Sequence, residues 1–213
     1  MCKIGIISDI HGDVESLEKA IRLFDQHGVQ TILCAGDTVE KGNHEDRVVQ
    51  LLKAARIPCV QGNHDENAIR HYHLSLALKP PAEIPLADET IEFLCQLPNV
   101  IEAEIAKIKV LVCHATPSDN GGRVFHAEGG NRLSKRFKKD LARTNCEVIV
   151  VGHTHSPIDV QYRGKRILNP GAVCKLKEKD SHTAGVLDLP SIKFSVFRLE
   201  DGKAIDLPSV EAV

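Results

Sequence analysis

The sequence lacks the features that mark a membrane protein, a secreted protein or a nucleic-acid-binding protein. None of its apolar runs approaches the ~20 residues that a membrane span needs. The N-terminus has no succession of basic, apolar and cleavage regions, so we expect no signal peptide. The net charge of −2 over 213 residues favours neither nucleic acid nor an anionic membrane as a standing partner.

The cysteines also lack a pattern. Their number, seven, is odd, and no C-x-x-C pair occurs. Cys34, Cys59, Cys113 and Cys146 lie in or beside apolar runs, where small buried thiols are common in a reducing compartment. We therefore expect free thiols and a cytoplasmic location, and we do not expect disulfides or thiolate metal sites.

No repeat, low-complexity segment or linker divides the chain, and its length suits one domain, so we expect residues 1–213 to form a single domain. Short apolar runs predict strands at 3–8, 31–35, 58–61, 100–105, 107–113, 148–151, 158–162, 166–169, 182–189 and 193–199. Helical spacing predicts helices between Asp13 and Gly28 and at 44–55, 66–72, 88–97 and 131–143, with a tail in the last dozen residues. This order favours an α/β fold in which helices cover mixed sheets.

Polar side chains follow five of these predicted strands, at the point where each strand ends. They occur in the segments Asp9-Ile10-His11-Gly12, Gly36-Asp37, Gly62-Asn63-His64-Asp65, His114 and Gly152-His153-Thr154-His155. Ligands of open α/β sheets bind beyond the carboxyl ends of the strands, so we expect the five segments to converge on one crevice. Each segment alone is a weak signal, but five of them are difficult to explain by structural roles only.

The chemistry of these side chains indicates a metal centre. Carboxylate and amide oxygens mixed with imidazoles suit Mn, Fe, Zn, Co or Ni better than Ca or Mg alone. In Asp9-x-His11 and His153-x-His155 the two side chains fall on one side of an extended segment, because strand side chains alternate with period two. The neighbouring glycines allow backbone and ligand to approach closely.

In their order and composition these motifs resemble those of the calcineurin-like metallophosphoesterases, over residues 8–155. Asn169-Pro170-Gly171-Ala172 is similar to the Asn-Pro-Gly turn of the small bacterial and archaeal phosphodiesterase branch. The resemblance implies a four-layer αββα sandwich, in which two mixed sheets are flanked by helices. It also implies hydrolysis of phosphodiesters, phosphomonoesters or both.

The resemblance further implies a role for each site residue. Asp9, His11 and His155 would hold one divalent transition-metal ion, Asn63, His114 and His153 would hold a second, and Asp37 would bridge them. Manganese is the leading expectation, with Fe, Zn, Ni or Co as alternatives. A hydroxide shared by the ions would attack phosphorus. His64 would protonate the leaving oxygen as general acid, and Asp65 would orient His64.

The segment Gly36–Gly42 does not decide which class of phosphate ester is the substrate. It is similar to the Gly-Asp-x-Val-Asp-Arg-Gly of serine/threonine phosphatases and dinucleoside tetraphosphatases, but Glu40 replaces Asp and Lys41 replaces Arg. Lys lacks the planar bidentate phosphate contact of Arg. Lys41 and Asp13 are nevertheless the expected substrate contacts, with loop and helix-cap roles as the alternatives.

A non-catalytic interaction scaffold of the same fold is the alternative from another class, and the complete ligand set argues against it. The expected partner is a small phosphate ester, without a nucleic-acid or membrane partner, and a homo-oligomer is left open. Residues 65–99 and 115–130 are expected to line the pocket mouth and set specificity. The basic residues near 132–143 are expected to form a solvated face or an anion-attracting rim.

Overall fold

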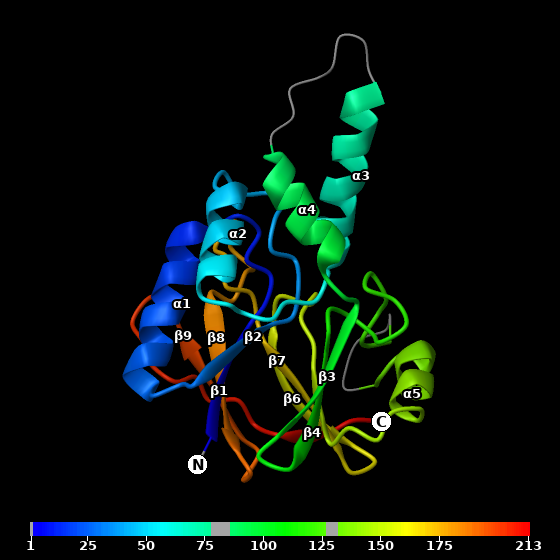
Figure 1. Ribbon diagram of the computed structural model, residues 1–213. Coiled ribbons are helices and arrows are strands. Elements are labelled where there is room, and N and C mark those ends of the chain that lie inside the picture. The colour runs from blue at the N-terminus through cyan, green and yellow to red at the C-terminus, as the bar shows by residue number, and fades with distance from the viewer. Residues whose placement is uncertain (1, 78–85, 127–131) are drawn as a thin grey trace.

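Two β-sheets lie face to face with helices outside them, as the computed structural model shows for residues 2–77, 86–126 and 132–213 (Figure 1). The helices are α1 (Val14–His27), α2 (Glu45–Ala54), α3 (Asn63–Ala77), α4 (Asp88–Gln96) and α5 (Lys135–Leu141). The strands are β1 (Cys2–Ile7), β2 (Thr31–Cys34), β3 (Val100–Ile105), β4 (Ile108–Cys113), β5 (Val148–Val150), β6 (Pro157–Tyr162), β7 (Lys165–Pro170), β8 (Thr183–Leu189), β9 (Lys193–Arg198) and β10 (Val210–Glu211).

Both sheets are mixed. In the described residues the first sheet has the order β2-β1-β8-β9, with β1 and β2 parallel and the other pairs antiparallel. The second has the order β10-β6-β7-β5-β4-β3, in which β4, β5 and β7 run parallel. The carboxyl ends of β1 and β2 in one sheet, and of β4 and β5 in the other, therefore point toward the same end of the sandwich (Figure 1).

Three apolar clusters separate the layers. Ile6, Val112 and Leu187 belong to the cluster between the two sheets. Leu17 of α1 and Leu52 of α2 pack in a second cluster on the outer face of the first sheet. A third cluster, which includes Phe137 of α5, covers the outer face of the second sheet. The order helix, sheet, sheet, helix confirms the four-layer αββα prediction.

Local sequence signals account for the boundaries of α1. Asp13 accepts a hydrogen bond from the Ser16 backbone N–H at 3.0 Å and so satisfies one of the free donors of the first turn. Gly28 ends the helix with φ 67°, a left-handed conformation that carries little steric cost for glycine. The predicted cap and the predicted helix end are both confirmed.

Two predicted elements differ in the structure. Residues 58–61 form a single bridge between Cys59 and Cys34 rather than a strand, because Pro58 has no N–H to continue a ladder. The helix predicted at 66–72 begins earlier, at Asn63, and ends at Ala77. Its apolar periodicity is weak, so the sequence pattern located only its middle.

The last dozen residues, expected to form a tail, contribute a short strand to the second sheet. Val210 and Glu211 pair in parallel with β6, and the Leu133 N–H bonds the Val213 carbonyl at 3.0 Å. Two residues are too few for a sequence pattern to reveal a strand. Residues 78–85 and 127–130 of the two segments expected to line the pocket mouth, and the start of the basic helix predicted at 131, lie outside the described residues.

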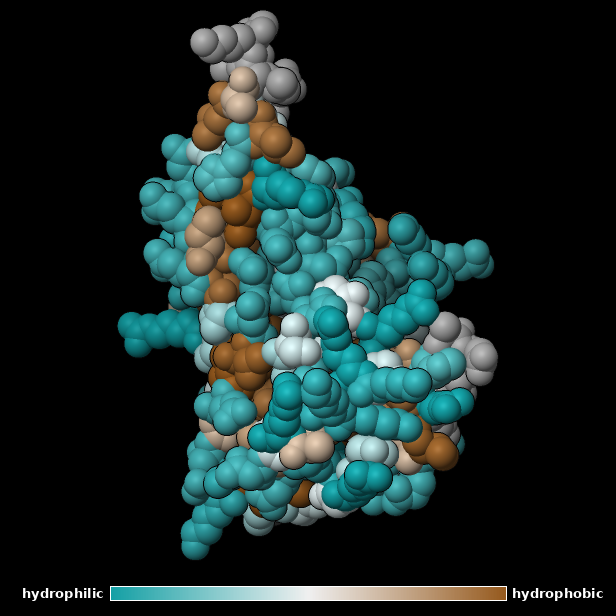
Figure 2. Space-filling view, turned by 90° about the vertical axis from the view of Figure 1, so that its right-hand side faces the viewer, coloured by the Kyte–Doolittle hydropathy of each residue, from teal (hydrophilic) through white to brown (hydrophobic). Residues whose placement is uncertain are grey.

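The helices α3 and α4 project beyond the sandwich at the end where the parallel strands terminate (Figure 1). Apolar residues gather along this projection, while the lower face is mostly hydrophilic (Figure 2). Two leucines of α3 are exposed to solvent, Leu74 at 59% and Leu76 at 50%. No helix among the described residues combines the length and apolarity needed to cross a bilayer.

The packing of α5 predicts a large effect for one side chain. Phe137 is fully buried between α5 and the second sheet, so Phe137→Ala should lower the free energy of unfolding by about 3–5 kcal/mol. Exposed Leu74 should tolerate Ala within ~0.5 kcal/mol. Urea-induced unfolding of both variants measures the difference. Equal effects would show that α5 does not cover a core layer.

Candidate metal centre

The loops after β1, β2, β4 and β5, together with the start of α3, bring all seven predicted ligand side chains to one end of the sandwich. In the first group, His155 Nε2 lies 3.3 Å from Asp9 Oδ1 and 3.2 Å from His11 Nε2. His11 Nε2 in turn lies 3.7 Å from Asp37 Oδ2. His11 and His155, separated by 144 positions in the chain, thus share one small volume with Asp9 and Asp37.

The second group meets the first at Asp37. His114 Nε2 lies 3.2 Å from the same Asp37 Oδ2, and His153 Nδ1 lies 2.9 Å from Asn63 Oδ1. The Asp37 carboxylate therefore lies between His11 and His114. This position is the one that a bridging ligand would occupy, although the ligand assignments themselves remain predictions.

The backbone of the ligand loops is held in an unusual conformation. Left-handed φ values occur at Asp9 (54°), His11 (50°), Asp37 (55°), His153 (65°) and His155 (55°). Non-glycine residues adopt such values at a cost of order 1–3 kcal/mol each, and they persist only where the surroundings enforce them. Their concentration in these loops indicates a functional site rather than a stability device.

Two glycines of the motifs are required by close approach. A Cβ at Gly152 would lie 1.8 Å from Ser8 Oγ, and a Cβ at Gly62 would lie 2.1 Å from Asp37 Oδ1. Neither contact is sterically possible. The glycines therefore let the β5 loop and the start of α3 pack directly against the loops that carry Asp9 and Asp37.

Hydrogen bonds fix the protonation of three imidazoles. His114 Nδ1 lies 2.7 Å from the Ala35 carbonyl oxygen, and His11 Nδ1 lies 3.0 Å from the Glu40 carbonyl oxygen. Because a carbonyl oxygen can only accept a hydrogen bond, each Nδ1 carries the hydrogen. His155 Nδ1 donates to Asp180 Oδ1 at 2.8 Å. Each ring therefore presents Nε2 to the centre, in the arrangement usual for metal-binding histidines.

The electrostatics of the buried centre call for a cation. Burial acts to raise the pKa of Asp9 and Asp37, but their histidine neighbours outweigh it and hold both pKa values below the ordinary range. The same pairing with Asp37 overcomes burial at His114 and raises its pKa to about 10. A retained proton at His114 thus supplies positive charge opposite ionised carboxylates.

The orphaned atoms support the same conclusion. Asp9 Oδ1 and His114 Nε2 are buried, and their ion-pair contacts at 3.3 Å with His155 and at 3.2 Å with Asp37 lack hydrogen-bond geometry. An unsatisfied buried polar atom costs ~1–3 kcal/mol, so it usually has a functional reason. Since the donor set mixes carboxylate, amide and imidazole groups, these residues fit divalent transition-metal ions.

Asp65 has a different role from the one expected. Its fully buried carboxylate accepts hydrogen bonds from the backbone N–H groups of Asp37, Thr38, Val39 and Gly62, at 2.8–3.1 Å, and from the Thr38 hydroxyl. Burial, and then the charge of Asp37, raise its pKa to about 6. The carboxylate thus shapes the loop that carries Asp37.

The carboxylate at the His64 ring is that of Glu40, which contacts His64 Nδ1. The expectation that Asp65 orients His64 is therefore corrected, because the donors around Asp65 occupy its oxygens. Glu40 was visible in the sequence only as a departure from the phosphatase motif. Its left-handed φ of 64° turns the loop so that its side chain reaches His64.

The two expected substrate contacts lie in different places. Lys41 Nζ is 3.3 Å from His11 Nε2 and lines the cavity over the centre. Asp13 caps α1 and also accepts the Lys175 N–H at 3.2 Å, and it is not among the residues that line this cavity. A role of Asp13 in substrate binding stays a prediction.

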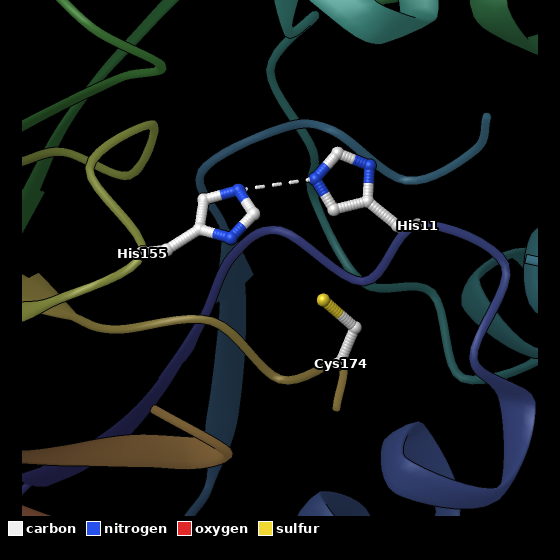
Figure 3. A group of neighbouring side chains, drawn as sticks. All are labelled: His11, His155 and Cys174. Atoms are coloured by element: carbon white, nitrogen blue, oxygen red, sulfur yellow. Dashed lines mark hydrogen bonds between the residues drawn. The ribbon is translucent and has the colours of Figure 1, made fainter. Parts of the chain in front are cut away.

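The cavity has a volume of about 290 Å³, and four of the candidate ligands, His11, Asp37, His153 and His155, line it. Among its lining residues are His64, Lys177, Lys179 and Cys174. Sequence reasoning missed Cys174 and the neighbouring Asp180, which lie just after the Asn-Pro-Gly turn. Figure 3 shows the Cys174 sulfur directed toward the rings of His11 and His155.

Comparison with known proteins agrees with this geometry. Residues 2–191 match the model of the calcineurin-like phosphoesterase superfamily domain. The chain belongs to this superfamily. This phosphoesterase is 26% identical to the phosphodiesterase YfcE of Escherichia coli over 216 residues, covering 96% of each chain. It is also 26% identical to a phosphodiesterase of Methanocaldococcus jannaschii over 200 residues, covering 93% of this chain and 99% of the relative.

Solved structures show the same fold. A metallophosphoesterase from Sphaerobacter thermophilus superposes with a TM-score of 0.71 at 22% identity, over 97% of this chain and 89% of the other. The resemblance inferred from the motifs is confirmed, and the family makes this protein a phosphoester hydrolase. Divalent metal ions are implied by the same membership.

The contacts of Asp65 predict a structural effect. Asp65→Asn replaces an oxygen acceptor by a donor, so at least one buried N–H of the Asp37 loop loses its partner and the free energy of unfolding should fall by at least ~2 kcal/mol. Asp201→Asn, in an exposed ion pair with Arg198, should leave it nearly unchanged, because solvent screens such pairs. Urea unfolding measures both. Unchanged stability with slower turnover would instead favour the original orienting role.

Proposed function

We propose that this phosphoesterase is a dinuclear metal-dependent phosphodiesterase. The observation that supports this most directly is the position of Asp37, whose carboxylate faces both His11 and His114. Asp9, His11 and His155 would hold one ion, and Asn63, His114 and His153 the other. The two ions would share Asp37.

The cations, when bound, supply charge that neutralises the phosphate and an ionised water at neutral pH. The chain supplies position and proton transfer. Lys41, beside His11, adds a positive charge at the phosphate. His64 lines the cavity with Nδ1 against the Glu40 carboxylate, so its Nε2 is left to donate a proton to the leaving oxygen.

A diester is favoured over a monoester for two reasons. Relatives named as phosphodiesterases match this chain over nearly their whole length. A second cavity of about 140 Å³ adjoins the first through Lys41 and is lined by Ala68 and Tyr72 of α3 and by Leu86. Glu40, Lys41 and Glu45 line the other side of this recess, and its apolar part, formed by residues of the 65–99 segment, would take the organic group of a diester.

The scaffold alternative explains the site poorly. A surface used only for protein binding does not require five left-handed ligand residues or orphaned buried atoms, both of which lower stability. The phosphatase-like alternative rests on Lys41. If only monoesters were hydrolysed and Lys41→Ala abolished that activity, the phosphatase-like interpretation of residues 36–42 would replace ours.

Metal reconstitution tests the proposal. Metal-free protein reloaded separately with Mn, Fe, Co, Ni, Zn or Mg should bind close to two transition-metal ions and hydrolyse bis(p-nitrophenyl) phosphate. Asp37→Ala should lose or weaken both ions, because both would share its carboxylate, whereas exposed Asp201→Asn should keep them. Elemental analysis counts the ions. No transition metal bound and no activity regained with Mn would reject the enzyme proposal in favour of the scaffold.

Substrates with different leaving groups test whether His64 is the general acid. His64→Gln should keep its metal content and lower kcat on alkyl or nucleoside esters by ~10²–10⁴-fold, because an alkoxide needs a proton to leave. The loss should be much smaller with p-nitrophenyl esters, whose leaving group is stable as an anion. His27→Gln, at the distant end of α1, should alter neither rate. Equal losses on both substrates, or loss of metal, would show that His64 is a ligand or a structural residue.

A further inference from the structure

Cys174 is brought to the metal centre by the segment that follows β7. The Val173 N–H bonds the Ser8 carbonyl at 2.9 Å, and the Cys174 N–H bonds the Asp9 carbonyl at 3.2 Å. The segment therefore runs alongside the loop that carries Asp9 and His11. Although Cys174 is fully buried by area, its side chain lines the cavity over the centre.

The thiol completes a three-residue group of ligand atoms. One ligand atom each of His11, His155 and Cys174 lies within 4.8 Å of the other two. The two imidazoles face each other through Nε2 atoms 3.2 Å apart, and the sulfur is directed toward the rings (Figure 3). Proteins combine imidazole nitrogens with thiolates to bind zinc and copper.

One carboxylate orients two members of this group. Asp180 Oδ1 accepts from His155 Nδ1 at 2.8 Å, and Asp180 Oδ2 lies 3.7 Å from Cys174 Sγ. The backbone N–H groups of Leu176 and Lys177 hold the same Oδ2 at 3.1 and 2.8 Å. Metal sites commonly use such an outer carboxylate to fix a ligating histidine, here His155, and mutating it costs metal affinity.

The environment of Cys174 differs from that of the buried structural cysteines. Cys34, Cys59, Cys113 and Cys146 pack in apolar clusters of the described residues. Cys174 belongs to none of these clusters, and its neighbours are histidines and a carboxylate. Packing therefore does not account for a thiol at this position.

We infer that Cys174 binds, as a thiolate, the ion that His11 and His155 hold, and this inference rests on the proposed dinuclear function. On binding, the sulfur–metal bond forms, the thiol proton leaves to solvent, and the metal keeps its oxidation state. A thiolate ligand makes the site softer than its oxygen and imidazole ligands alone. This ion is consequently Zn, Fe or Co rather than Mn or Mg.

Cobalt substitution tests the inference without measuring activity. Metal-free protein is loaded with two equivalents of Co²⁺, bound cobalt is counted, and the near-ultraviolet spectrum is recorded for thiolate-to-cobalt charge-transfer absorption. Wild-type protein and the control Cys146→Ala, which removes a buried thiol of an apolar cluster, should both show the absorption. Cys174→Ala should lose it. Far-ultraviolet circular dichroism of the metal-free variants establishes that each is folded.

A competition measurement gives a second readout. Cys174→Ala should weaken Zn²⁺ binding at least ~10-fold, while Mn²⁺ binding changes less. The ratio of the Zn²⁺ affinity to the Mn²⁺ affinity should therefore fall. Cobalt bound to wild-type protein without the absorption would overturn the inference and leave the dinuclear proposal standing. An absorption retained in Cys174→Ala would also overturn it. Failure of wild-type protein to bind cobalt at all would overturn the dinuclear proposal itself.

Discussion

The carboxylate of Asp37 lies between His11 and His114, and the loops of both sheets are arranged around it. A buried carboxylate is costly unless positive charge or hydrogen bonds compensate it. Here the pKa of Asp37 stays low despite burial, because His114 opposes it with a retained proton. The same compensation from a cation would release that proton. The side chains of the site therefore supply only part of the positive charge that its buried carboxylates require.

The conformation of the Asp37 loop depends on a second buried carboxylate. The Asp65 carboxylate accepts hydrogen bonds from the N–H groups of the loop, although Asp65 lies 28 residues after Asp37 in the chain. Because Asp65 lies in the first turn of α3, the helix that begins at Asn63 and the loop that carries Asp37 are held as one unit. Two of the candidate ligands are consequently fixed relative to each other before any metal binds. Such preorganisation lowers the reorganisation needed for binding.

The sandwich explains how strained loops can be maintained. Three apolar clusters hold the layers together, and the ligands lie on loops beyond the strand ends rather than in those clusters. The core stabilises the fold, and the loops carry the left-handed residues and orphaned atoms. The helix α3 and the segment 40–45 line the second cavity beside the centre. The candidate metal ligands and this cavity thus lie on neighbouring parts of one scaffold.

The sequence by itself determined the four strands β1, β2, β4 and β5 that precede ligand segments, the cap and end of α1, and the motifs of the superfamily. These features are local: short apolar runs, a capping Asp13 and Gly28, and Asp-x-His spacing all act within a few positions. The sequence pattern alone did not reveal the contacts of Glu40 with His64, of Asp65 with the Asp37 loop, or of Cys174 with His11. Only tertiary structure decided these, because they join segments from different loops and both sheets, and the packing of the sheets, not the local spacing, sets which side chains meet.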